Sequence, residues 1–240
     1  MKKSVLSWVV VLLLWQGLAL LVDNTILIPA PVEVFLKMFG QLQDFSFWNH
    51  LGQTFFRILV AFVMSLLVSF ILVVLKLKNK YLDNFINQLL MILRVVPTAA
   101  IILMALVWLT PHNSIILITL LVMIPLMVDL LQQQFDRIKK DYREPIVIYG
   151  SSTMDNLLKV FIPLSLESFL TLCRSAVLLG LKVVVSSEVL VSIQVGLGRQ
   201  LQYARFDLDM NRLFAITIWV ILIAVGVTKV FDYLIDKSRY

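Results

Sequence analysis

The sequence predicts an all-α, polytopic membrane protein with about six transmembrane helices. Of its 240 residues, 60% are hydrophobic and only 15% are charged, and the mean hydropathy is +0.92. A soluble domain carries about 45–50% apolar and about 25% charged residues. The apolar runs approach the roughly 20 residues that a helix needs to cross a bilayer. The net charge of +6 favours basic cytoplasmic loops over nucleic-acid binding. At this size we expect one membrane domain over residues 1–240.

The first predicted span runs from Val5 to Val22, after two lysines. A basic start followed by an apolar run also occurs in signal peptides, but this run is long and no small-x-small cleavage site precedes Asp23. We therefore predict a retained helix. The slightly acidic segment Asp23 to Asn49 is expected outside, with an amphipathic helix from Val32 to Leu42 for which Pro31 is a suitable first residue.

The second span is predicted from His50 to Leu75, and the three lysines within residues 76–80 mark the inner side. The next apolar segment, Tyr81 to Leu109, is too long for one simple crossing. We expect its first part to lie along the cytoplasmic boundary and Arg94 to Leu109 to complete the crossing, bent at Pro97.

Three further spans follow, at Ser114 to Leu131, Leu164 to Val191 and Arg212 to Ile235. Between the last two, Val195 to Asn211 is predicted as an outer loop. Lysine and arginine gather on alternate segments, and this bias predicts that both termini are cytoplasmic.

The segment of about residues 136–163 is long, polar and basic, and it separates two apolar runs. Tyr142 to Tyr149 can form a short helix, which Gly150 can end in the left-handed conformation. A serine that follows can cap the next helix, and Pro163 ends the segment. A short helix on the inner face suits docking into a groove of a partner protein.

This segment resembles the E-A-A loop of ABC-importer permeases, through Glu144, Gly150, Val160, Ile162 and Pro163. It departs from that loop where Pro145 and Ile146 replace two alanines. The resemblance implies a cytoplasmic coupling helix that docks an ATPase. The residues expected to dock are Arg143, Glu144, Tyr149, Gly150, Ser151, Ser152 and Pro163.

Other segments resemble the nitrate/sulfonate/taurine/thiamine-precursor group of these permeases. They are IPAPVEVF at residues 28–35, the T-x-x-R of Thr54 and Arg57, the R-x-x-P-x-x-A of Arg94, Pro97 and Ala100 with Trp108, and the G-L-G of residues 196–198 with Ala204. The chain departs from the group at Leu109 and Thr110, which replace Phe–Gly, and at Met104, which lies near the place of a second proline.

The resemblance implies the type I ABC-importer permease fold and a role as the transmembrane subunit of an ATP-driven importer. The solute would be a nitrate-, sulfonate- or taurine-like anion or a vitamin precursor. The implied partners are an ABC ATPase dimer, a second permease copy or homologous permease, an extracellular substrate-binding protein and membrane lipid. ATP and Mg would be held by the ATPase, with no cofactor on this chain. The expected location is the bacterial cytoplasmic membrane.

Lys182 is expected near the middle of the fifth span. Inserting a lysine there costs about 2.5–3.5 kcal/mol, so a functional role is the default hypothesis. Lys182 could attract an anionic solute, or it could pair with a carboxylate. Glu188 is an unsuitable partner within the same helix, since six residues correspond to about 600° of rotation. We expect Glu188 to face a dimer interface or the path. The predicted path residues are Arg57, Thr98, Met104, Lys182, Ser186, Ser187 and Glu188.

Alternatives within and outside the transporter class stay open. An amino-acid or metal importer could share the same permease fold. A membrane-embedded enzyme or a sensor is a different class, but the chain has no H-E-x-x-H, G-x-S-x-G or Walker A motif. One cysteine and two histidines in separate predicted loops offer no metal site. We therefore expect a non-catalytic subunit, with ATP hydrolysed on another chain.

Overall fold

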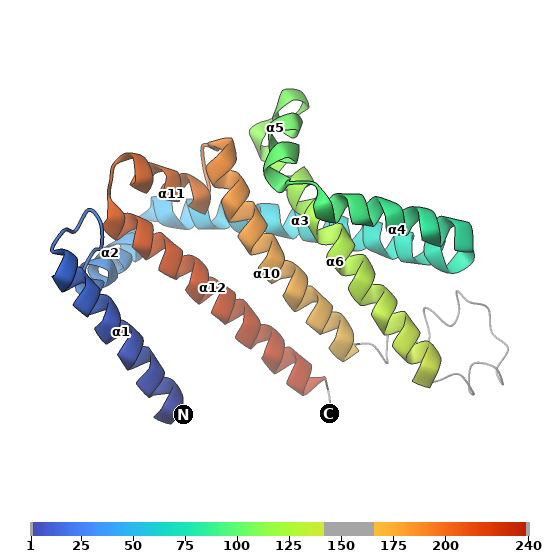
Figure 1. Ribbon diagram of the computed structural model, residues 1–240, viewed down its shortest axis with the longest axis horizontal. Coiled ribbons are helices and arrows are strands. Elements are labelled where there is room, and N and C mark those ends of the chain that lie inside the picture. The colour runs from blue at the N-terminus through green and yellow to red at the C-terminus, as the bar shows by residue number, and fades with distance from the viewer. Residues whose placement is uncertain (1, 142–165, 239–240) are drawn as a thin grey trace.

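The computed structural model describes residues 2–141 and 166–238, and the regular structure in these residues is helical (Figure 1). This confirms the all-α prediction. The helices are α1 (Lys2–Val22), α2 (Pro31–Gln43), α3 (Phe45–Lys78), α4 (Lys80–Val95), α5 (Thr98–Trp108), α6 (Pro111–Asp141), α10 (Leu166–Val191), α11 (Leu197–Phe206) and α12 (Met210–Lys237).

Four described helices, α3, α6, α10 and α12, are long and apolar enough to cross a membrane. The pair α4 and α5 provides up to one more span, but it is bent by 97°. In α1, the part whose side chains are described, Val9–Val22, is a shorter apolar helix. The span count thus agrees roughly with the six that the sequence predicts.

The predicted bend of the third crossing at Pro97 is confirmed, but it is a full break in the helix. Helix α4 ends at Val95 and α5 begins only at Thr98. Pro97 has no N–H, and it disfavours helical geometry at the residue before it. Val96 is accordingly extended, with φ −63° and ψ 126°. The 11 residues of α5 reach only about 16 Å, about half of the hydrocarbon core.

Helices α3, α6 and α10 form the centre of the molecule, and α4 lies along α3 and α6 (Figure 1). On α3, Ala61, Ser65 and Ser69 recur every fourth residue and are fully buried. These small side chains allow α3 and α6 to approach closely. The Ser65 hydroxyl lies 2.6 Å from the carbonyl oxygen of Ala61 in its own helix and 3.4 Å from that of Leu120 in α6.

At one end of the bundle, α2 packs against the start of α12 through Val34, Met38 and Ala215. Lys37 of α2 pairs with Asp209 at 3.0 Å, and Asp209 accepts a hydrogen bond from the N–H of Arg212 at 2.9 Å. Partial burial favours the neutral form of Asp209. The Arg212 N–H and Lys37 outweigh it and hold the pKa of Asp209 below its usual value. The predicted amphipathic helix that Pro31 begins is thereby confirmed as α2.

The segment Val195 to Asn211, which the sequence analysis treats as a loop, contains helix α11. Leu197, Leu201 and Ala204 recur at helical spacing. Leu197 and Ala204 are fully buried against the neighbouring helices. The stretch is short and polar overall, so composition alone indicates a loop, whereas the spacing of its few apolar residues indicates the helix.

Leu208, in the turn between α11 and α12, has a positive φ of 52° and is 59% exposed. A side chain other than glycine costs about 1–2 kcal/mol in this conformation. We therefore expect Leu208→Gly to raise the melting temperature of the purified protein. Leu208→Ala is the matched control, because it also shortens the side chain but keeps the Cβ atom that causes the strain. Equal melting temperatures for the two variants would contradict the explanation.

Candidate functional site

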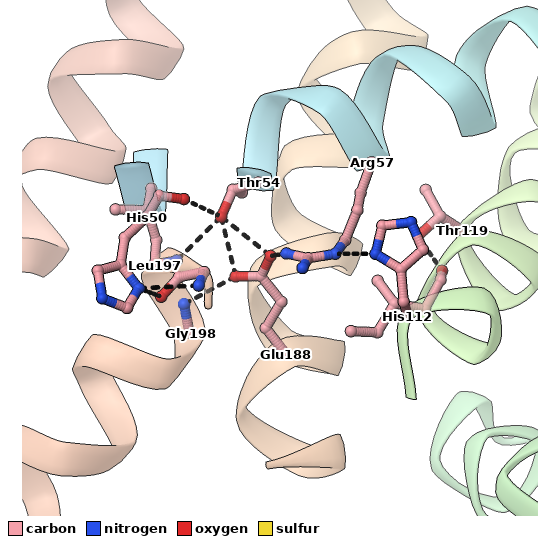
Figure 2. A network of polar contacts seen from close by, with 10 residues as sticks. His50, Thr54, Arg57, His112, Thr119, Glu188, Leu197 and Gly198 are labelled. Carbon is pink, nitrogen blue, oxygen red and sulfur yellow. Dashed lines mark hydrogen bonds and ion pairs between the residues drawn. The ribbon is translucent and has the colours of Figure 1, made fainter. Parts of the chain in front are cut away.

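The most buried charges described in the molecule form one ion pair between α3 and α10 (Figure 2). Nη1 of Arg57 lies 2.6 Å from Oε1 of Glu188. Arg57 is 3% exposed and Glu188 is not exposed at all. Burying a single charge is costly, so each of these groups requires the other to stay ionised inside the bundle.

Glu188 has two further donors. The Thr54 hydroxyl lies 2.9 Å and 3.0 Å from its two oxygens, and the Gly198 N–H donates to Oε2 at 2.8 Å. Thr54 and Arg57 are three residues apart on α3, so they lie on the same face of the helix. The T-x-x-R pattern of the sequence therefore places a hydroxyl and a guanidinium on one carboxylate (Figure 2).

The two glycines of the G-L-G sequence are required by close approach to this carboxylate. A Cβ atom on Gly196 would lie 2.5 Å from Cδ of Glu188, and one on Gly198 would lie 2.4 Å from Cβ of Glu188. The N–H of Leu197, between them, donates to Oγ1 of Thr54 at 2.9 Å. The turn from α10 into α11 is thus fastened to both α3 and the end of α10.

Both histidines of the chain belong to the same network, one on each side of the ion pair (Figure 2). The Gly196 N–H donates to Nδ1 of His50 at 2.9 Å, and Nε of Arg57 donates to Nδ1 of His112 at 3.2 Å. Each Nδ1 is therefore an acceptor, and Nε2 carries the proton of the neutral ring. No local sequence pattern links His50 or His112 to this network, because their partners lie on other helices.

We call Thr54, Arg57 and Glu188, with the backbone of residues 196–198, the Glu188 cluster. Its groups surround both oxygens of Glu188 with donors, and they join α3, α10 and α11 into one unit. Within the described residues no set of three His, Cys, Asp or Glu side chains could hold a metal ion. The geometry fixes helices in place: the Thr54 hydroxyl, which contacts the Glu188 carboxylate, is fully buried and also accepts from the Leu197 N–H.

The predicted path residues fall into two groups by burial. Arg57, Ser187 and Glu188 are buried within the chain, which differs from the expectation that Glu188 faces an interface or the path. The reason is that Arg57 on α3 draws Glu188 inwards. The other four residues are exposed: Thr98, Met104, Lys182 and Ser186. Whether any of the seven contacts a solute stays a prediction.

Lys182 is exposed and makes no hydrogen bond or ion pair with the described residues. Ser186 lies one turn further along α10 and is exposed as well, so the two form a polar face of this span. The alternative in which Lys182 pairs with Glu188 is excluded, since Glu188 pairs with Arg57. This exposed face is the second feature of the candidate site.

Other charged groups join neighbouring helices. Nη2 of Arg94 lies 2.6 Å from both oxygens of Asp129, which joins α4 to α6, and Arg174 of α10 pairs with Asp232 of α12. Buried Lys76 of α3 donates to Asn87 of α4 at 2.7 Å and also bonds Gln132 of α6. These contacts hold α4 and α12 against the central helices.

The docking residues that the sequence predicts lie outside the described residues. They are Arg143, Glu144, Tyr149, Gly150, Ser151, Ser152 and Pro163. The docking loop therefore stays a prediction. Only the start of that segment is described, and there α6 continues as a helix to Asp141, ten residues beyond the predicted end of the fourth span at Leu131.

Residues 65–239 match the protein family described as the binding-protein-dependent transport system inner membrane component. The chain belongs to this family. The match covers most of the chain, including the span that carries Lys182 and the whole of the G-L-G turn. The protein is thus the membrane-embedded permease subunit of an ABC importer. Such a subunit is non-catalytic, because ATP is hydrolysed on a separate subunit of the importer, and it works with that ATPase and a substrate-binding protein.

Two relatives and one solved structure agree with this family. The permease is 23% identical over 180 residues to a formylaminopyrimidine transport permease protein of Halalkalibacterium halodurans, covering 73% of this chain and 70% of the relative. It is 25% identical over 230 residues to a Methanocaldococcus jannaschii protein provisionally named an ABC transporter permease, covering 93% and 86%.

The fold is similar to that of a chain in an inward-facing form of the MetNI methionine ABC transporter. The TM-score is 0.66 at 16% identity, covering 80% of this permease and 93% of that chain. This likeness supports the type I importer permease fold and carries no information on the solute.

The Glu188 cluster yields a prediction about stability. Arg57→Met should lower the free energy of unfolding by about 3–5 kcal/mol, because it leaves the buried carboxylate unpaired. Adding Glu188→Gln should recover part of this loss, since the amide is neutral and its oxygen can still accept from Gly198. The measurement is the melting temperature of the purified permease.

Arg174→Met is the matched control for this pair of variants, because Asp232 is half exposed and is hydrated when its partner is lost. Its expected cost is about 0–1 kcal/mol. A double variant no more stable than Arg57→Met alone would contradict the charge explanation.

Proposed function

We propose that this permease forms the path for a small anionic or strongly polar solute, such as a nitrate, a sulfonate or taurine, along the face of α10 that carries Lys182. The observation that supports this most directly is that Lys182 is exposed and has no partner among the described residues. A lysine facing hydrocarbon costs about 2.5–3.5 kcal/mol, so such a residue normally faces water or another protein chain.

The position of Lys182 along the helix strengthens the argument. It lies 16 residues after Leu166, the first residue of α10, and nine before Val191, the last. These separations correspond to about 24 Å and about 14 Å. Both are long enough to place the ammonium group well inside a span. The neighbouring Ser186 adds a hydroxyl on the same face, which suits a solute with oxygen atoms.

A second solute class is a vitamin precursor. It is favoured by one observation, the printed name of the Halalkalibacterium relative, which describes formylaminopyrimidine transport. A neutral heterocycle would use the hydroxyl of Ser186 and would not require the charge of Lys182. A variant that keeps the side-chain length but removes the charge therefore separates the two classes. An amino-acid or metal solute is a weaker alternative, which identification of the substrate-binding protein would decide.

The assembly that we propose has two permeases, either two copies of this chain or a pair of homologues, on a dimer of ATPases. Both termini are cytoplasmic, and the solute arrives on an extracellular binding protein. ATP and Mg belong to the ATPases, and this chain carries no cofactor. Closure of the ATPases would push on residues 141–155 and turn the spans outward. The permease then contributes contacts with the solute that differ between the inward and the outward state.

For an anionic solute, Lys182→Met should reduce ATP-driven uptake at least tenfold, because it removes the cation from the path. Lys182→Arg should keep most of the uptake. Lys229→Met, at an exposed lysine of α12, is the control for removing a charge elsewhere in the membrane part. The measurement is uptake of labelled solute into proteoliposomes that contain the whole importer. Unchanged uptake in Lys182→Met would refute the anionic path.

The docking prediction is tested at Gly150. Gly150→Val should uncouple ATP hydrolysis from transport or release the ATPase, since a β-branched residue resists positive φ. Gly150→Asn is the matched control, because asparagine tolerates the left-handed region far better. Co-purification of the ATPase and coupled turnover are measured together. Normal coupling in the valine variant would contradict the predicted docking loop.

A further inference from the structure

A hollow of about 440 Å³ opens beside the Glu188 cluster, between the start of α3, the turn before α6 and the end of α10. Arg57 and His112 line it, together with the side-chain amides of Asn49, Gln53 and Gln194. Its volume lies within the usual range for small-molecule sites, about 300–1,000 Å³. The Glu188 cluster explains why Arg57 and His112 are held here, but it does not use the hollow itself.

The hollow offers hydrogen-bond donors. Arg57 uses Nη1 for Glu188 and Nε for His112, and its Nη2 makes no hydrogen bond to any described residue. His112 accepts at Nδ1, so its Nε2 carries a proton and is a second donor. The guanidinium is held by two partners, and a ligand would therefore meet a donor that is already in position, with little rotamer entropy left to lose.

The lining of the hollow favours an acceptor over a cation. None of the described residues that line it is acidic, and its one charged residue, Arg57, is paired with Glu188 behind it, so the hollow offers donors rather than an excess of positive charge. The three amides are also without hydrogen bonds in the described chain, so their N–H groups are available. A lining that has several N–H donors and no carboxylate suits a ligand group that only accepts hydrogen bonds and carries a negative charge.

We propose that this hollow is a binding subsite for the oxyanion head group of the transported solute, a sulfonate, carboxylate or nitrate. This inference rests on the proposed function and deepens it. It names the chemical group that the permease recognises and the residues that recognise this group. Arg57 lies 12 residues after Phe45, the first residue of α3, and beside the last turn of α10. Lys182 precedes Glu188, the partner of Arg57, by six residues, about 9 Å along the helix axis and about 600° of rotation, so it lies on another face of α10. The subsite and the exposed lysine are therefore separate contact points for the solute.

The test uses two probes of nearly the same shape, methanesulfonate and its neutral analogue dimethyl sulfone. The permease is assembled with its ATPase in lipid nanodiscs, and binding is measured by calorimetry at constant ionic strength. We expect methanesulfonate to bind saturably and dimethyl sulfone to bind at least tenfold more weakly. Equal binding of the two probes, or no saturable binding of methanesulfonate, would overturn the proposal.

The variants place a negative charge in the hollow without touching the Glu188 cluster. Gln53→Glu and Gln194→Glu should each weaken methanesulfonate binding at least tenfold, because a carboxylate repels the probe. Gln43→Glu, at an exposed glutamine at the end of α2 that does not line the hollow, makes the same charge change and should leave binding unaltered. Equal loss in all three variants would show a general surface-charge effect and would sink the assignment.

Uptake measurements separate this inference from the proposed function. If Gln53→Glu and Gln194→Glu transport a sulfonate as the unaltered importer does, the hollow is not a subsite, whereas the anionic path along α10 stands. If Lys182→Met loses uptake while methanesulfonate binding is retained, the path and the subsite are both supported as separate contact points.

Discussion

The ion pair between Arg57 and Glu188 is the interaction on which the arrangement of the central helices depends. A carboxylate inside the bundle requires a cation and neutral donors, and these come from α3 and from the turn into α11. The requirement explains the two glycines of that turn, since a Cβ atom at either would collide with Glu188. One buried charge thus determines where three helices lie relative to one another.

The same physics distinguishes the charged residues that hold the fold from those that are available for transport. Arg57, Arg94 and Arg174 each have a carboxylate partner on another helix, and buried Lys76 pairs with Asp83 of α4 and bonds two amide oxygens. Lys182 has no such partner among the described residues, although it lies within a membrane span. Because an ion in hydrocarbon is costly, its exposure indicates a surface that faces water or protein. In the proposed function, that surface is the route of the solute.

Much of the helix layout could be predicted from the sequence. Hydropathy and length identified the spans that became α3, α6, α10 and α12, and Pro31 identified the start of α2. The errors were local conflicts between composition and geometry. Pro97 indicated a bend, but not that the helix stops at Val95 and starts again at Thr98, and the polar composition of residues 195–211 hid α11. For the candidate site, the T-x-x-R and G-L-G patterns were visible, but their common partner was not.

The sequence by itself determined which segments are apolar, how long they are and which ionisable residues fall inside them, because hydropathy and helical period are local properties of the chain. Only the tertiary structure decided which of those residues are paired. Thr54 and Arg57 meet Glu188 more than 130 residues away, and His112 joins from a third helix. Such pairings follow from the packing of whole helices. The residues next to Glu188 or Lys182 in the sequence do not predict how the helices pack. That packing turned Glu188 inwards to hold the fold and left Lys182 outside.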